Sequence, residues 1–82
     1  MEPNADALDS RGLVYLKLDQ WELAISDFSA ALGLDPSRAA SLYGRGMAYS
    51  RKGETDRADA DYAAAKAVAP NIADEFARRG LN

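Results

Sequence analysis

The sequence has no cysteine and no histidine among its 82 residues. The absence of cysteine excludes disulfides, thiolate nucleophiles and thiolate metal sites, and the absence of histidine removes the commonest general base and metal ligand. The remaining residues do not assemble into a nucleophile, a base and an orienting group. We therefore expect a protein that is not an enzyme, with no catalytic residues, no metal and no other cofactor.

Long apolar runs and an excess of basic charge are also missing. No segment approaches the roughly 18 apolar residues of a membrane span, and the N-terminal MEPNAD is acidic and lacks the apolar run of a signal peptide. Ten lysines and arginines stand against 13 aspartates and glutamates, which gives a net charge of −3. This sign disfavours duplex DNA, because phosphate neutralisation supplies most non-specific affinity. We expect no membrane and no nucleic-acid partner, and a cytoplasmic location.

An internal repeat organises the chain. When the sequence is aligned with itself at a shift of 34 residues, apolar and turn residues recur in register. The matched pairs are Leu8 with Leu42, Tyr15 with Tyr49, Ala24 with Ala58, Phe28 with Tyr62, Ala31 with Ala65, and Pro36 with Pro70. Such a fixed period indicates repeated supersecondary units that stack on one another.

The spacing of apolar residues predicts the secondary structure. Within each unit, apolar and small residues recur at intervals of three and four, as on one face of a helix. The pattern predicts an all-α fold with helices over residues 5–18, 21–33, 37–52, 55–68 and 72–80. Polar residues at the expected helix starts are candidate N-caps: Asn4, Asp19 with Glu22 as a capping box, Asp35 beside Pro36, and Asn71.

The period and its residues resemble the tetratricopeptide repeat (TPR), whose pattern has W-x2-L-G-x2-Y, A-x3-F and P positions. The first unit has Leu8, Arg11, Gly12, Tyr15, Ala24, Phe28 and Pro36 at these places, and the second has Leu42, Arg45, Gly46, Tyr49, Ala58, Tyr62 and Pro70. The resemblance implies one TPR domain over 1–82, with repeats at 5–38 and 39–72 and a partial third repeat or capping helix at 73–82. It also implies a right-handed superhelical stack of antiparallel hairpins, an α-solenoid of about five helices. Because the third unit stops before its tyrosine, we expect the sequence to be part of a longer chain.

A glycine recurs at the same place in each unit, at Gly12, Gly46 and Gly80. A glycine inside a helix costs about 0.5 to 1 kcal/mol relative to alanine, so a packing advantage has to offset it. We expect the missing Cβ atoms to let the second helix of each unit approach closely. The expected contacts are of Gly12 with Ala24 and Phe28, and of Gly46 with Ala58 and Tyr62.

The arginine before each glycine departs from the family's usual leucine. Asp27 and Asp61 lie at equivalent places on the expected second helices, level with Arg11 and Arg45 in an antiparallel hairpin. We therefore predict two ion pairs between helices, Arg11 with Asp27 and Arg45 with Asp61, which cover the edge of the core with arginine's aliphatic stem. An RNA-binding arginine-glycine element is the alternative, but such elements are disordered and these dipeptides lie inside expected helices.

In the TPR family, the face of each first helix that turns away from its own second helix lines a concave groove. Carried onto this chain, the resemblance places a peptide-binding groove at Asp9, Leu13, Leu16, Lys17, Tyr43, Met47, Ser50, Arg51 and Arg78, with Asp6, Ser10, Ala40, Gly44 and Asp74 beside them. This assignment gives the groove an apolar floor, a basic end and an acidic end. The alternative is that the apolar side chains only cover the hairpin interior.

The resemblance implies a non-catalytic protein–protein interaction module, within a scaffold or co-chaperone-like protein. We expect a peptide with an apolar anchor near Tyr43 and Met47 and a carboxylate near Lys17 and Arg51. Binding of a chaperone tail is disfavoured because Gly44 stands where an asparagine is needed. Self-association is the second hypothesis, because a solenoid edge that no helix covers favours a homodimer.

Overall fold

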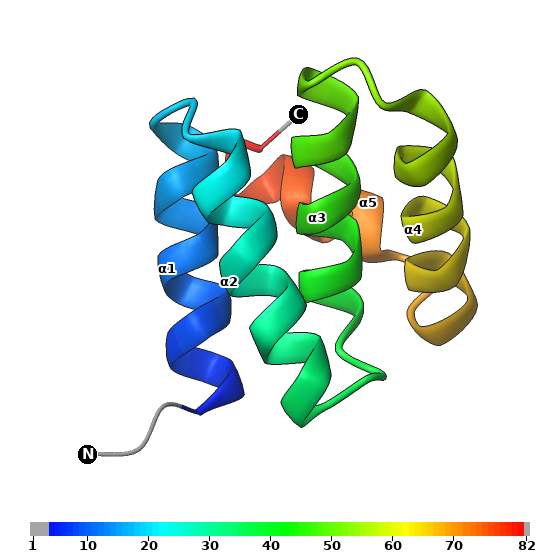
Figure 1. Cartoon of the computed structure of the whole chain (residues 1–82). Coiled ribbons are helices and arrows are strands. Elements are labelled where there is room, and N and C mark those ends of the chain that lie inside the picture. Colours follow the sequence, from blue (N-terminus) through cyan, green and yellow to red (C-terminus); the bar gives the residue numbers. More distant parts are fainter. Residues whose placement is uncertain (1–3, 82) are drawn as a thin grey trace.

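Five helices make up the fold in the computed structural model, which describes residues 4–81 (Figure 1). They are α1 (Ala5–Lys17), α2 (Trp21–Leu34), α3 (Ala39–Arg51), α4 (Thr55–Val68) and α5 (Ile72–Arg78). Two parts of the sequence discussed above, residues 1–3 of the acidic N-terminal segment and residue 82 of the partial third repeat, lie outside the described residues. Residues 4–81 contain no strand, so the all-α class is confirmed. None of their helices is long and apolar enough to cross a bilayer.

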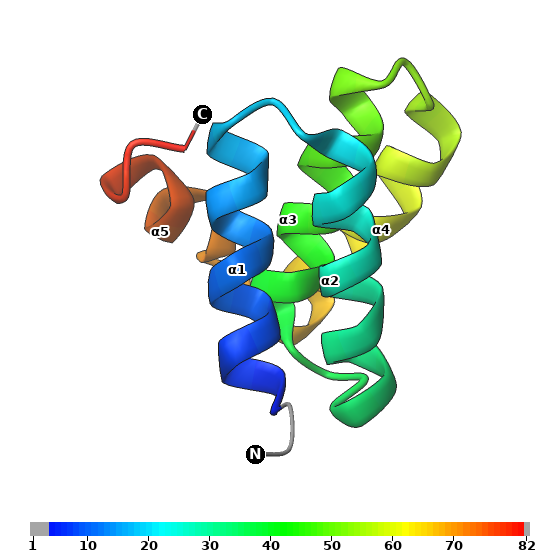
Figure 2. The same ribbon diagram turned by 60° about the vertical axis from the view of Figure 1, so that its left-hand side comes forward.

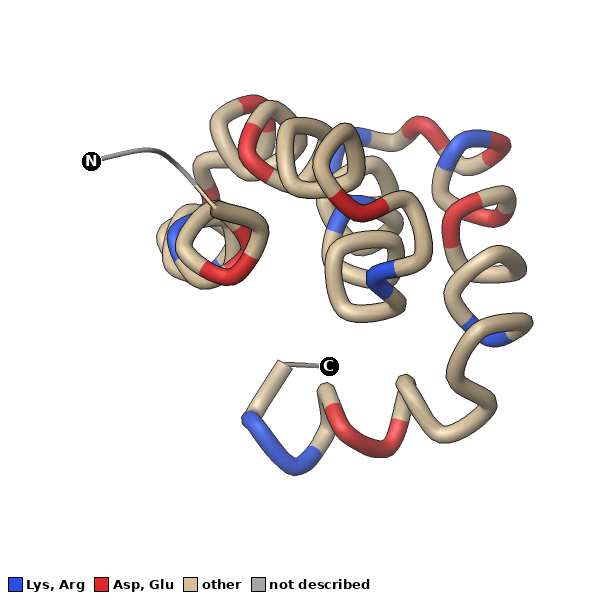
Figure 3. Tube along the Cα trace, turned by 90° about the horizontal axis from the view of Figure 1, so that it is seen from below, with Lys and Arg blue, Asp and Glu red and all other residues tan. Residues whose placement is uncertain are grey.

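The four longer helices form two hairpins, α1 with α2 and α3 with α4, and α2 packs on α3 to join them. The short helix α5 has a different direction. Figure 3, which looks from below, shows α5 running across the molecule on the side of α3 opposite to α2. It packs on α3 and α4, and Figure 2 shows it on the side of α1 and α3 that lies away from α2. Both first helices therefore present one face toward the C-terminal part of the chain.

One apolar core runs through both hairpins and continues into α5. Its largest side chains, Phe28 of α2 and Phe76 of α5, are completely buried. The second helices contribute small residues at their contacts, namely Ala24, Ala31, Ala58 and Ala65, which are at most 1% exposed. Because the distance between helix axes depends on the side chains at the contact, these alanines bring neighbouring helices close together.

The first two helix starts follow the sequence prediction only in part. Asn4 caps α1 as predicted, since its side-chain oxygen accepts a hydrogen bond from the N–H of Ala7 at 2.8 Å. The prediction that Asp19 caps α2 is wrong. Gln20 holds the N-cap position of α2, and it makes no side-chain cap hydrogen bond.

The later helix boundaries also differ from the prediction. The third helix begins at Ala39 and not at residue 37, because Asp35 turns the chain by accepting hydrogen bonds from the N–H and the hydroxyl of Ser37. Asn71 holds the N-cap position of α5, but its side chain makes no cap hydrogen bond. The fifth helix ends at Arg78, two residues before the expected end.

The three first-position helices α1, α3 and α5 end in the same left-handed turn. The residue in this turn is Asp19, Gly53 or Gly80, with φ of 62°, 86° and 78° respectively. In each turn the next N–H returns to a carbonyl five residues earlier at 2.9 Å: Gln20 to Tyr15, Glu54 to Tyr49, and Leu81 to Phe76. This is the Schellman pattern, in which glycine is favoured because a Cβ strains a positive φ. Asp19 therefore holds a place that suits glycine.

This comparison predicts that Asp19→Gly stabilises the protein by about 0.5 to 1 kcal/mol, because the left-handed turn loses its strain. Gly53→Asp makes the reciprocal change at the equivalent position and should destabilise by a similar amount. Urea denaturation followed by circular dichroism measures both free energies of unfolding. A loss of stability in Asp19→Gly would show that the aspartate side chain contributes more than the strain costs.

Candidate functional site

The hairpins are closed by contacts between a glycine and an aromatic ring, as the sequence predicts. A Cβ atom built on Gly12 would lie 2.8 Å from the ring of Phe28, and one on Gly46 would lie 2.9 Å from the ring of Tyr62 and 3.2 Å from the carbonyl oxygen of Ala58. Real Cβ atoms do not approach a ring within 3.0 Å, so a larger residue at either place would force the ring to move. The prediction of close approach is confirmed for Gly12 and Gly46.

The third glycine of the series has another role. Gly80 lies beyond the end of α5 with φ of 78°, and a Cβ atom added there would meet nothing within 4 Å. The expectation that Gly80 packs inside a helix is therefore wrong. Because α5 stops at Arg78, the position that packs in the first two units becomes the turn residue in the third.

Phe28 also ties the two repeats together through Gly44. A Cβ atom on Gly44 would lie 2.5 Å from the far end of the Phe28 ring, and Gly44 is buried. The expectation that Gly44 lines the groove is wrong, because α2 covers this part of α3. Ser10, the equivalent residue of α1, is exposed.

The two predicted ion pairs are present with matching geometry. Arg11 donates from Nε to one Asp27 oxygen at 2.7 Å and from Nη2 to the other at 2.9 Å. Arg45 donates to both oxygens of Asp61 at the same two distances. Both pairs are bidentate, which is the stronger form of arginine–carboxylate contact. These hydrogen bonds are the main reason why the pKa values of Arg11 and Arg45 are raised.

The two ion pairs differ in how far they are shielded from water. The Arg11 side chain is 61% exposed, whereas that of Arg45 is 23% exposed. Arg45 lies in the seam between the repeats, where its Nη1 also donates to the Ser29 hydroxyl at 3.2 Å. A charge pair gains strength when water is removed from around it, provided that its hydrogen bonds are made.

Two double-mutant cycles should show that the two ion pairs differ in coupling energy. We expect the cycle of Arg45→Ala with Asp61→Ala to give a coupling energy of about 1 to 2 kcal/mol, because this bidentate pair is largely shielded. The cycle of Arg11→Ala with Asp27→Ala should give a weaker coupling that falls further when salt is added. Thermal or urea unfolding supplies the free energies. Equal coupling in both cycles would contradict the role given to shielding.

A buried polar seam joins α1 to the start of α3, and the sequence prediction missed it. Asp9 is 7% exposed and accepts a hydrogen bond at 2.9 Å from the hydroxyl of Ser41, which is fully buried. Arg38 lies 2.8 Å from Asp6 and 3.7 Å from Asp9. The expectation that Asp9 belongs to an open acidic end of the groove is therefore wrong. The available signal was an acidic residue at the repeat position where the second unit has Tyr43.

The part of the predicted groove around Tyr43 is covered by α5. Tyr43 is half-buried, and its ring centroid lies 4.7 Å from that of Phe76 and 4.9 Å from that of Tyr62. Both distances and the tilted ring planes are typical of favourable aromatic pairs. The side chain of Tyr43 therefore contacts the protein's own C-terminal helix.

A hollow of about 210 Å³ brings four of the predicted groove residues together. Leu16 and Met47 line it and are 5% and 6% exposed, and Lys17 and Arg51 line it as exposed cations. Its other lining residues, which the sequence did not assign to the groove, are Asp19, Trp21, Gly80 and Leu81. The guanidinium of Arg51 lies 5.8 Å from the centre of the Trp21 ring, within the range of a cation–π contact.

The remaining predicted groove residues do not line this hollow. Leu13 is half-buried and packs against the core, which agrees with the simpler interpretation that it covers the hairpin interior. Ser50 and Arg78 are exposed, as are Asp6 and Asp74, and Ala40 is half-buried.

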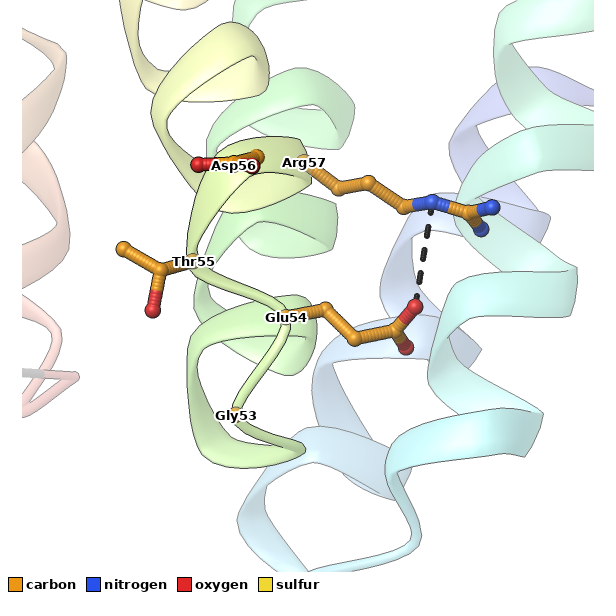
Figure 4. A pocket seen from close by; sticks show the side chains of 5 residues that line it. All are labelled: Gly53, Glu54, Thr55, Asp56 and Arg57. Carbon is orange, nitrogen blue, oxygen red and sulfur yellow. Dashed lines mark ion pairs between the residues drawn. The ribbon is translucent and has the colours of Figure 1, made fainter.

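A second hollow, of about 360 Å³, lies at the turn between α3 and α4 (Figure 4). Its lining residues are consecutive, from Gly53 to Arg57, and Figure 4 shows Arg57 directed toward Glu54 at an ion-pair distance of 3.7 Å. This hollow contains none of the predicted groove residues and is framed by one turn alone. The hollow between α1, α3 and the C-terminal segment is thus the better candidate for a binding site.

Comparison with known proteins identifies one family. A sequence model described as tetratricopeptide repeat matches residues 5–38 and again residues 39–72. The searches of curated proteins and of solved structures each found no match.

Proposed function

Because the chain belongs to the tetratricopeptide repeat family, whose members are generally non-catalytic protein–protein interaction modules, we propose that it binds a peptide or partner domain on the face of α1 and α3. The single observation that supports this site is the hollow in which Leu16 and Met47 form an apolar floor below Lys17 and Arg51. Binding sites commonly combine apolar walls with a few convergent polar groups, and this hollow has both.

The lining residues indicate the chemistry of the ligand. A leucine, methionine or phenylalanine side chain would extend the apolar floor, and Trp21 offers a flat wall beside it. Two cations and one carboxylate, Asp19, leave a net positive rim on a protein whose overall charge is −3. A ligand with a carboxylate beside its apolar anchor therefore fits best, because a cation holds a carboxylate by charge-assisted hydrogen bonds.

The test is a titration of ¹⁵N-labelled protein with short peptides that carry one leucine or phenylalanine and a free C-terminal carboxylate. We expect amide shifts at Leu16, Lys17 and Met47. Lys17→Ala should weaken the affinity about fivefold, because one charge-assisted contact is lost. Lys66→Ala is the matched control, since it removes an exposed lysine from the last turn of α4, away from the hollow. Shifts confined to α2 and α4 would contradict this site.

A second candidate function is self-association through the outer edge of α1. The observation that favours it is a contrast between equivalent residues: Val14 is 54% exposed, whereas its counterpart Ala48 is fully buried beneath the first repeat. Leu18 is 62% exposed on the same edge. In the second repeat the corresponding surface of α3 is covered by α2. A helix of a second copy could cover the outer edge of α1 in the same way.

Sedimentation equilibrium tests this second candidate. A homodimer that uses the α1 edge should dissociate in Leu18→Lys, which introduces the lysine found at the equivalent position 52. Leu34→Lys is the control, because Leu34 is similarly exposed at 58% but lies at the far end of the α1–α2 hairpin. A wild-type protein that remains monomeric at millimolar concentration excludes this function.

A further inference from the structure

The face of α1 and α3 is partly covered by the C-terminal segment of the same chain, residues 72–81. Helix α5 lies across this face on the side of α3 away from α2, and the chain beyond it turns toward α1 (Figures 2 and 3). Two side chains of this segment are buried against the face, Phe76 at 0% and Leu81 at 8% exposure. The first contacts Tyr43, and the second lines the hollow together with Leu16 and Met47.

The backbone of this segment places Phe76 and Leu81, its two apolar anchors, on the same side. Phe76 lies in the last turns of α5, and the left-handed turn at Gly80 allows Leu81 to leave the helix direction. The N–H of Leu81 donates to the carbonyl of Phe76 at 2.9 Å, which fixes the distance between the two anchors. A hydrophobic contact between these two positions commonly accompanies such a turn, so both side chains point to the same surface.

Few buried side chains hold the segment. Helix α5 has seven residues, which is too short for a helix to be stable by itself in water. Within residues 72–81, only Ile72, Phe76 and Leu81 are buried, and the residues between them are exposed or half-buried. The glycine contacts and the two bidentate ion pairs, which join α1 to α2 and α3 to α4, lie outside the segment. We therefore expect the two hairpins to keep these contacts when α5 is released.

We propose that residues 72–81 are a displaceable internal ligand, and that the partner presents the same two anchors: an aromatic residue in a helical turn and a leucine five positions later, after a glycine. This inference rests on the proposed function, because it names the ligand of the same face. Release of the segment exposes Leu16, Tyr43 and Met47, and a partner with matching anchors covers them again. Local segments of low stability are the ones that open most readily in a folded protein.

The probe for the test is the acetylated peptide NIADEFARRGLN, which copies residues 71–82. The 82-residue Leu81→Ser variant should bind this peptide about tenfold more tightly than the wild-type chain, because the competing anchor is weakened. Amide shifts should appear at Leu16, Tyr43 and Met47. A peptide with serine at both anchor positions should not bind. The control variant Leu34→Ser, which changes an exposed leucine, should bind like the wild type.

Hydrogen exchange of the wild-type protein tests the opening without any substitution. The amides of α5 should show protection about tenfold or more below that of α2 and α3, since they exchange through local release. Equal protection in all helices would overturn the proposal, as would a folded Leu81→Ser variant with no gain in affinity. Wild-type dimers that show the same amide shifts would identify a second copy as the occupant and would also overturn it.

These results are distinguishable from a failure of the proposed function. If α5 stays closed while carboxylate peptides still shift Lys17 and its neighbours, the binding site stands and the internal-ligand inference fails. If the copied peptide binds the Leu81→Ser variant but no foreign peptide binds either protein, the segment is displaceable and the proposed function fails.

Discussion

The ring of Phe28 is the contact on which the rest of the structure depends. It fills the space that the missing Cβ atom of Gly12 leaves in α1, and its far end fills the corresponding space at Gly44 in α3. One side chain thus fixes the distance within the first hairpin and the distance between the two repeats. Because close-packed interiors tolerate little change in volume, the relative placement of α1, α2 and α3 follows from this contact.

The second repeat solves the same problem with a different set of side chains. Tyr62 takes the place of Phe28 and packs on Gly46, but its other neighbour is the ring of Tyr43 at 4.9 Å instead of a glycine. Tyr43 in turn packs against Phe76 with tilted ring planes, so an aromatic series connects α4 through α3 to α5. Burial is the main cause of the raised pKa of Tyr62. Contacts between aromatic rings therefore join α3, α4 and α5, whereas the contact of the Phe28 ring with two glycines joins α1, α2 and α3.

Equivalent positions of the two repeats have different environments because each repeat has a neighbour on a different side. Arg11 and Arg45 make the same two hydrogen bonds to their aspartates, yet only Arg45 is covered by a neighbouring repeat. Asp9 and Tyr43 occupy the same place in their repeats, and each contacts a residue of the first helix of the next unit: Ser41 of α3 for Asp9, and Phe76 of α5 for Tyr43. The chemistry of the face of α1 and α3 is thus set as much by the next helix as by the residues of the face itself.

The sequence by itself determined the features that lie within one repeat. The period, the helix-forming faces, the glycine–aromatic contacts and both arginine–aspartate pairs connect residues whose spacing recurs, so one repeat supports the interpretation of the other. Only the tertiary structure decided what happens between units. The burial of Asp9 depends on Arg38 at the end of the first repeat and on Ser41 of the second, and the covering of Tyr43 depends on Phe76 of a short helix whose direction no periodicity encodes. Local spacing sets which face of a helix is apolar, but the packing of the neighbouring elements decides whether that face is open or filled.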